Sequence, residues 1–273
     1  MTDSWWIKFK RAQRHMVEIR HAARLYAEQR PYQIVRVRPS KKQPKRWRYR
    51  LTFDEADPMI VAMIGDFIHN LRSALDHIVF ACSKPKDRKT ASFPIEVHDI
   101  WDKCPACGNF IHGDDERREN FRRAIKGLGA HATAVVLGAQ PYQSDTPATH
   151  VLGVLSRLEN ADKHRKIVAT GTNLRGGILS VFIRGKIYKT YTIGHRHFFY
   201  NNAEVLSFTV ANPNLREADV KVEGRGTAMI SIKDRGIVGN EEPADFMIYS
   251  TMLMALNNVR YILKLMEPYV IRS

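Results

Sequence analysis

The apolar residues of this chain recur at two spacings, and each spacing predicts a different kind of element. Steps of three and four residues predict long helices over 4–29, 58–81 and 241–267. Alternation of apolar and polar residues predicts two strands over 32–38 and 46–53, joined by a loop that contains Pro39 and Pro44. Several short β-rich runs, separated by Gly, Asn and Pro, follow between 166 and 234.

These elements predict an α+β fold in two domains. We expect residues 1–165 and 242–273 to form a helical bundle of the long N-terminal, central and C-terminal helices. This domain would also carry a basic β-hairpin at 30–53 and a cysteine loop at 98–116. Residues 166–241 would form an antiparallel β subdomain inserted before the last helix.

The central helix combines the clearest apolar stripe of the chain with its densest group of polar side chains. Two histidines, an asparagine, an arginine and two aspartates lie between Asp66 and His77. A solvated helix face would account for polarity, but such faces usually contain Lys and Glu instead. The density therefore indicates a functional site on this helix, without naming a reaction.

A second polar group ends the helix that begins near 146. Asp162 continues the apolar stripe of Val151, Leu155 and Leu158, so its carboxylate must be paired or the helix must be ending. One interpretation brings Asp162 to Arg72 or to a histidine of the central helix; the other is a buried ion pair that only joins two helices. The candidate catalytic residues are Asn70, Arg72, Asp76, His77, Asp162 and His164.

The charge of the chain is its strongest indication of a binding partner. The formal net charge is +15, and residues 30–53 contain nine basic residues and no acidic one. Such a surplus favours polyanions, nucleic acid first, through release of counterions. The predicted contact residues are Arg36, Arg38, Lys41, Lys42, Lys45, Arg46, Trp47, Arg48 and Arg50. In the alternative, the aromatic residues face the core and the arginines are only solvated.

The cysteines indicate a metal loop rather than disulfides. Cys104-Pro-Ala-Cys107-Gly followed by His112 has the form of a zinc knuckle. The fourth ligand of a structural Zn²⁺ would be His98, Asp114 or Asp115, or would come from a second subunit; otherwise the loop holds two free thiols. Three cysteines, no apolar run of ~18 residues and no signal peptide predict a cytoplasmic protein without a membrane partner.

No sequence motif of the common enzyme classes is present. The chain lacks a G-x-S-x-G elbow, a Walker A loop, a G-x-G-x-x-G turn and an H-E-x-x-H helix. This absence disfavours hydrolase, nucleotide-dependent and dehydrogenase functions. A metal-dependent enzyme using Asp76, His77, Asp162 and His164 is a smaller alternative.

Two resemblances add to these patterns. The strings FIHNLRSALDHIVF, FPI, QPY and LENADKHRKI, within 60–170, resemble a group of uncharacterised bacterial and phage-borne proteins. More loosely, Arg72-Ser-Ala-Leu-Asp-His77, and also Arg157 to His164, resemble the Arg–x(4–6)–His motif of the HEPN superfamily, whose members are all-helical and often metal-independent ribonucleases.

The second resemblance implies a homodimer that cleaves RNA at the cleft between its subunits. His77 would act as acid or base, Arg72 would stabilise the charged phosphorane, and Asn70 and Asp76 would orient them. RNA is then favoured over DNA. The alternative function is a non-catalytic nucleic-acid-binding or assembly protein, in which the polar cluster is only structural.

Overall fold

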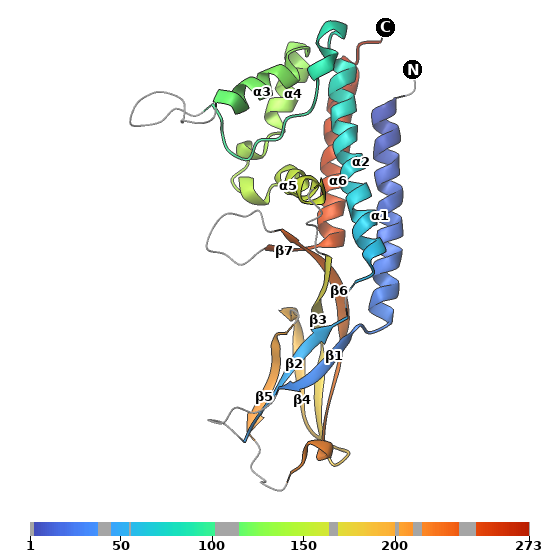
Figure 1. Cartoon of the computed structure of the whole chain (residues 1–273), viewed down its shortest axis with the longest axis vertical. Helices are drawn as coiled ribbons and strands as arrows, with labels where there is room; N and C mark the ends of the chain where they lie inside the picture. Colours follow the sequence, from blue (N-terminus) through green and yellow to red (C-terminus); the bar gives the residue numbers. More distant parts are fainter. Residues whose placement is uncertain are drawn as a thin grey trace, which may run out of the picture. The chain divides into compact units, whose positions relative to one another are not determined.

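The protein has a mixed α+β fold that divides into two compact units (Figure 1). The computed structural model describes residues 3–37, 45–54, 56–101, 115–163, 169–199, 202–209, 215–234 and 244–272. Unit 1 comprises residues 1–19, 62–167 and 234–273, and unit 2 comprises 20–61 and 168–233. No helix in these described ranges is long and apolar enough to cross a membrane.

Unit 1 is helical. Its elements are the first part of α1 (Ser4–Glu28), most of α2 (Pro58–Cys82), α3 (Asp115–Ile125), α4 (Ala130–Gly138), α5 (Val151–Lys163), a short strand β7 (Ala244–Met247) and α6 (Ile248–Met266). The predicted apolar stripes are buried: Trp5, Phe9 and Met16 on α1, and Phe67, Leu71 and Leu75 on α2, are all less than a tenth exposed. These stripes supply the core because residues three and four apart share one helix face.

Polar contacts join the ends of three helices within unit 1. Trp6 Nε1 of α1 donates a hydrogen bond to Glu267, directly after α6 (3.1 Å), and Cys82 Sγ of α2 lies 3.5 Å from the carbonyl oxygen of Met266. The backbone N–H of Ile271 donates to the carbonyl of Ala81 at 3.0 Å. The chain's last described residues are therefore fixed to the C-terminal end of α2.

Unit 2 contains a three-stranded sheet and three strands of a four-stranded sheet. One has the order β1 (Tyr32–Val37), β2 (Arg46–Phe53), β5 (Glu204–Thr209). The other has β3 (Ala169–Ile183) between β4 (Lys186–Phe199) and β6 (Val220–Asp234). Their inner faces pack together through Trp47, Tyr49 and Leu206 from the first sheet and Val181 from the second.

Gly224 on β6 allows the two sheets to approach closely. A Cβ at this position would lie 2.5 Å from Cδ1 of Ile34 on β1 and 3.0 Å from a methyl carbon of Leu179 on β3. The Ile34 side chain therefore occupies the space that any larger residue at position 224 would need.

The β1–β2 hairpin belongs to unit 2 and not, as predicted, to the helical domain. The sequence-based division placed residues 30–53 with the helices, whereas β2 pairs with β5, so that the hairpin forms part of unit 2. The reason is tertiary: β5 pairs with the edge of β2, and the apolar face of the hairpin packs against the second sheet. The short β-rich runs near 167–183 also join into one strand, β3, with register shifts after Gly171 and Arg175.

Candidate functional site

The polar residues of α2 point toward three different surroundings. His69 is exposed and lies 3.4 Å from the hydroxyl of Ser73 one turn on. Asn70 is buried, and its side-chain amide donates to the carbonyl of Asp66 within the same helix at 2.7 Å. The side-chain amide of Asn70 thus bonds to a backbone carbonyl of its own helix. None of its contacts within the described residues orients Arg72 or His77.

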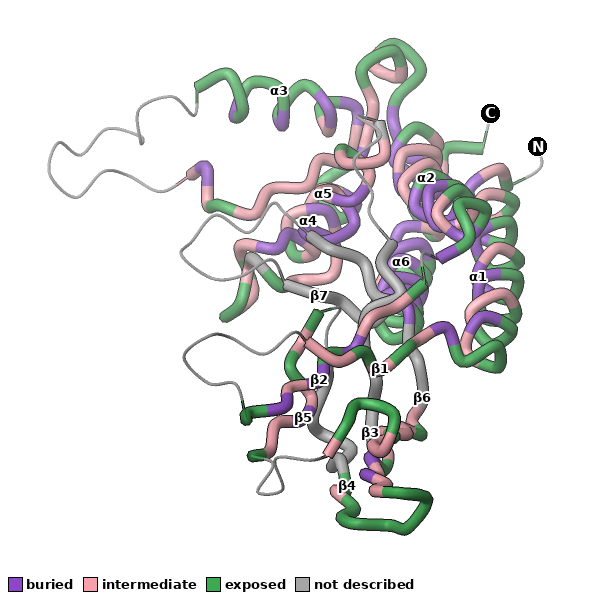
Figure 2. The backbone as a smooth tube through the Cα atoms, turned by 60° about the horizontal axis from the view of Figure 1, so that its bottom comes forward, coloured by how far each residue is buried: buried purple, intermediate pink, exposed green. Residues whose placement is uncertain are grey.

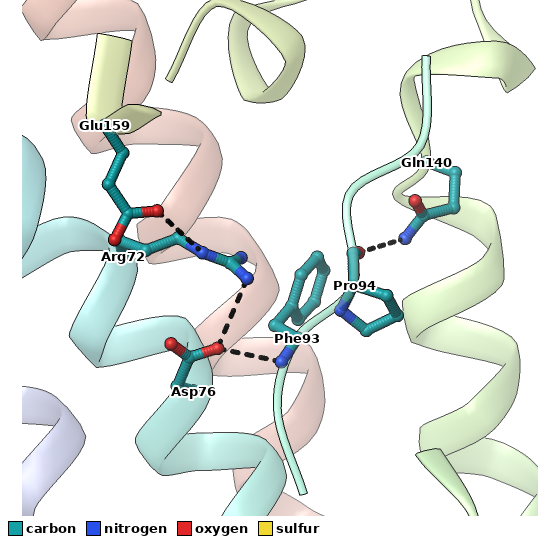
Figure 3. Close-up of polar contacts among 6 residues, drawn as sticks. All are labelled: Arg72, Asp76, Phe93, Pro94, Gln140 and Glu159. Atoms are coloured by element: carbon teal, nitrogen blue, oxygen red, sulfur yellow. Dashed lines mark hydrogen bonds and ion pairs between the residues drawn. The ribbon is translucent and has the colours of Figure 1, made fainter. Parts of the chain in front are cut away.

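Arg72 is held between two carboxylates (Figure 3). Its Nε lies 3.3 Å from an oxygen of Glu159 on α5, and Nη2 lies 3.5 Å from Oδ1 of Asp76 one turn along α2. The Arg72 and Glu159 side chains are only 16% and 13% exposed. A guanidinium neutralised on two sides and largely withdrawn from solvent serves to link α2 to α5.

Asp76 connects the same cluster to the extended FPI segment (Figure 3). Its Oδ1 accepts a hydrogen bond from the backbone N–H of Phe93 at 2.9 Å, and the Phe93 ring is buried. The Asp76 carboxylate therefore links the backbone of Phe93 to the guanidinium of Arg72.

Gln140 holds the other side of the FPI segment. Its Nε2 donates to the carbonyls of Pro94 (2.9 Å) and Val136 (2.8 Å), while its Oε1 accepts from the backbone N–H of Glu96 (2.9 Å). Hydrogen bonds therefore join three of the four strings noted in the sequence: HNLRSALDH, FPI and QPY. The fourth string, LENADKHRKI, is joined to them by the ion pair between Glu159 and Arg72.

Asp162 lies against α2 at a glycine. A Cβ on Gly65 would come within 2.6 Å of Oδ1 of Asp162, so the carboxylate occupies the space beside a residue that has no side chain. Asp162 is half-buried, as the apolar stripe of its helix predicted. His164, the last member of the predicted catalytic set, lies outside the described residues.

His77 leaves α2 on a different side from Arg72, because five residues turn an α-helix by about 140°. Its Nδ1 lies 3.1 Å from the hydroxyl oxygen of Ser4 on α1. Burial lowers the pKa of His77, the nearby Lys8 lowers it further, and Asp76 opposes both. Within one chain, then, the predicted pair Arg72 and His77 has different partners, on α5 and on α1.

The predicted nucleic-acid residues of the hairpin separate into two faces. Trp47 and Tyr49 are each 5% exposed and face the core, while Arg46 and Arg50 on the opposite face are exposed and Arg48 is half-buried; the alternation along β2 can be followed in Figure 2. The ring of Trp47 is consequently covered by protein and is closed to a stacking base, which corrects its place in the predicted contact set.

Arg36 also lies on the packed face. Its guanidinium carbon is 3.9 Å from the centre of the Trp47 ring, and Nη1 forms an ion pair with Glu217 at 2.8 Å. The register explains this position, because Arg36 on β1 is directly opposite Tyr49 on β2 and opposed residues share a face. Of the remaining predicted residues, Lys45 is exposed, whereas Arg38, Lys41 and Lys42 lie outside the described residues.

The predicted zinc ligands are mostly outside the described part of the chain. Cys104, Cys107 and His112 fall there, and His98 is an exposed residue before that segment. Among the described residues, no group of three or more His, Cys, Asp or Glu side chains could hold a metal ion. The structural Zn²⁺ stays a prediction, and so does the metal-dependent alternative.

Sequence reasoning missed Glu159 and Gln140. Glu159 is the main partner of Arg72, and the available signal was its position one turn before Asp162 on the same helix. Gln140 appeared only within the string QPY, although it is buried and its side chain makes three hydrogen bonds. A buried amide between two segments can satisfy backbone groups of both, and sequence alone does not show which segments meet.

Comparison with known proteins adds no further assignment: neither a family model, nor a curated protein, nor a solved structure matches this chain. The function is therefore argued from the geometry of the chain itself.

Proposed function

We propose that this protein binds nucleic acid through the outer face of the β1–β2–β5 sheet, by contacts to phosphate groups rather than by reading bases. The observation that carries the proposal is the row of Arg46, Arg48 and Arg50 on one side of β2. Alternate residues of a strand lie about 7 Å apart, so the three guanidinium groups are spaced to contact successive phosphates of one strand.

The neighbouring strand β5 adds polar residues to this face, whereas β1 places Val35 and Val37 opposite Arg50 and Arg48. Ser207 and Thr209 on β5 are opposite Arg48 and Arg46, and opposed residues point to the same side. Arg46 Nη2 donates to the hydroxyl of Ser207 at 3.1 Å. Hydroxyl groups beside arginines are themselves donors to phosphate oxygens.

One carboxylate moderates the charge of this face. Glu204 lies 4.0 Å from Arg46 and 3.9 Å from Arg48, at the limit of ion pairing and partly exposed to solvent. Pairs of this kind contribute little to stability, so that phosphate can replace Glu204 as the partner of both arginines. Arg50 is exposed and has no ion-pair partner within the described residues.

The test is the salt dependence of binding, measured by fluorescence anisotropy with a labelled RNA and a DNA of the same sequence. We expect the slope of log K against log salt to be smaller by about two to three in the triple variant Arg46→Gln, Arg48→Gln, Arg50→Gln, because three phosphate contacts are lost. A matched control removes the same charge from exposed lysines of unit 1: Lys84→Gln, Lys86→Gln, Lys89→Gln. An equal change in both variants, or no change in the first, would contradict the proposal.

An endoribonuclease of the HEPN kind is the second candidate. It is supported by one observation, that His77 faces Ser4 at the wall of a pocket and therefore lies at a surface a ligand can reach. Incubation of the labelled RNA in EDTA tests it: cleavage by the wild-type protein that is lost in a folded His77→Ala variant would support it. If the RNA stays intact and its binding depends on salt, only the binding function is supported.

Three further predictions accompany the proposal. We infer that the long helices form one bundle into which the β unit is inserted, and that the protein is a homodimer carrying a structural Zn²⁺. Sedimentation velocity measures the assembly state, and elemental analysis of the purified protein measures the zinc content.

A further inference from the structure

A pocket of about 370 Å³ lies in unit 1, where residues from both ends of the chain meet the C-terminal part of α2. Its size is within the range of small-molecule sites. It is lined by residues that precede or begin α1, by the last turns of α2, by one residue of the following 3₁₀ helix (Pro85–Thr90) and by the C-terminal segment: Asp3, Ser4, Trp5, His77, Phe80, Ala81, Arg88, Val270, Ile271 and Arg272. The positions of the two chain ends can be followed in Figure 1.

One part of the lining is cationic and rich in donors. Arg88 and Arg272 bring two guanidinium groups, and Ser4 and His77 contribute a hydroxyl and an imidazole 3.1 Å apart. Asp3 is the single acidic residue of the lining. The first N–H groups of α1, a helix of 25 residues, begin at Ser4 and add positive potential at the same place.

The other part of the lining is apolar. Trp5 is almost fully buried, and it lines the pocket together with the more exposed Val270 and Ile271. Phe80 is 47% exposed, unusual for a phenylalanine, and the guanidinium of Arg88 lies 5.2 Å from the centre of its ring. Arg88 also donates from Nε to the carbonyl of Ser83 at 3.2 Å, which holds its side chain beside Phe80 at the pocket.

We propose that this pocket binds a small organic anion, with its oxyanion group held by Arg88, Arg272 and His77 and its apolar body packed on Trp5, Phe80 and Ile271. Two arginines provide planar, charge-assisted donors, which suit phosphate, sulfonate or carboxylate groups. The exposed ring of Phe80 and the buried ring of Trp5 suit an aromatic or aliphatic body. The inference goes beyond nucleic-acid binding and uses residues of unit 1 alone.

Binding is tested with benzenesulfonate, whose single charge does not change between pH 5 and 8, by isothermal titration calorimetry. The double variant Arg88→Gln, Arg272→Gln should bind roughly ten-fold or more weakly, because hydrogen bonds to a charged group are lost. The control Arg11→Gln, Arg14→Gln removes two exposed charges from α1 and should keep the wild-type affinity within about two-fold. Equal losses in both variants, or no saturable binding to the wild type, would overturn the proposal.

Methanesulfonate carries the same group without the ring and separates the two parts of the pocket. We expect benzenesulfonate to bind the wild type several-fold more tightly than methanesulfonate, and Phe80→Ala to remove most of that advantage. Equal affinities for the two anions in the wild type would contradict the apolar subsite and indicate general attraction of anions. If the Arg88 variant does not fold, Arg272→Gln alone replaces it, because Arg272 is exposed near the chain end.

The protonation of His77 gives a second readout. The charged groups around it are Lys8 and Asp76, which act on its titration, and Asp3, Arg88 and Arg272 in the pocket. An oxyanion beside His77 favours the imidazolium, so benzenesulfonate should bind more tightly at pH 5.5 than at pH 7.5. His77→Gln should remove this pH dependence; a pH dependence that persists in His77→Gln would exclude His77 from the site.

Discussion

Arg72 is at the centre of a set of polar contacts that links three segments of unit 1. Its guanidinium contacts Glu159 of α5 and Asp76 of its own helix, and Asp76 in turn holds the backbone of Phe93. Since the side chains of Arg72 and Glu159 are both largely buried, removing either charge takes an ion-pair partner from the other in a poorly solvated place.

This arrangement predicts strongly non-additive mutations. Arg72→Met or Glu159→Met alone should lower the free energy of unfolding by about 2–4 kcal/mol, and the double variant should cost much less than the sum. Urea unfolding followed by circular dichroism measures all three. If the single variants fold normally and lose RNA cleavage instead, Arg72 is catalytic rather than structural.

His77 makes stability depend on pH in a defined direction. Burial lowers its pKa in the folded state, so the unfolded chain takes up a proton at higher pH than the folded one. The free energy of unfolding should therefore fall as the pH decreases through the ordinary histidine range near 6.5, and be unaffected by His77 above it. Burial lowers the pKa of His150 as well, with the same sign.

Comparison of the wild type with His77→Gln at pH 7.5 and 5.5 checks this prediction. The variant should lose less stability over that interval, and His77→Gln combined with His150→Gln should lose still less. A wild-type loss that is unchanged in the double variant would assign the acid sensitivity to other groups.

At the scale of elements, the contact between α2 and α5 requires Gly65. The carboxylate of Asp162 fills the place where a side chain on Gly65 would begin. Gly65→Ala adds helix propensity, yet we expect it to destabilise the protein by about 1–3 kcal/mol because Asp162 must move.

A second substitution distinguishes crowding from a general effect on α2. Combining Gly65→Ala with Asp162→Ala should cost less than Gly65→Ala alone, if the clash is the cause. Gly153→Ala on α5 is a milder comparison, since its nearest neighbours would lie 3.2 Å or more from the new Cβ. Thermal or urea unfolding of the three variants gives the answer.

Local sequence patterns predicted some elements correctly but did not predict which elements pair with them. Three-and-four spacing predicted α1 and α2, and alternation predicted β1 and β2, because these periods reflect the geometry of single elements. The pairing of β2 with β5 could not be predicted in this way: Arg46 and Ser207, which hydrogen bond across it, are 161 positions apart. The same holds for the candidate site, where Arg72 and Asp76 were identified but Glu159 and Gln140 were not.

For the whole molecule, the net charge of +15 has two opposite consequences in salt. Repulsion among the positive charges is screened as salt is added, so the melting temperature of the free protein should rise between low salt and about 0.15 M, where the Debye length is about 8 Å. Attraction to polyanions is screened by the same ions.

Differential scanning fluorimetry with and without RNA measures both effects. The RNA-dependent increase in melting temperature should be largest at low salt and should shrink as salt is added. An RNA-dependent increase that is constant across the salt series would show that the contacts are not mainly ionic.

The pocket in unit 1 is bordered by Asp3, Ser4 and Trp5 from one end of the chain and by Val270, Ile271 and Arg272 from the other. Any polypeptide fused to either end would leave the protein beside this opening. A histidine-rich purification handle could therefore compete with ligands there. Removing the handle by proteolysis, or inserting it at the exposed Arg184–Gly185 turn between β3 and β4, avoids that interference.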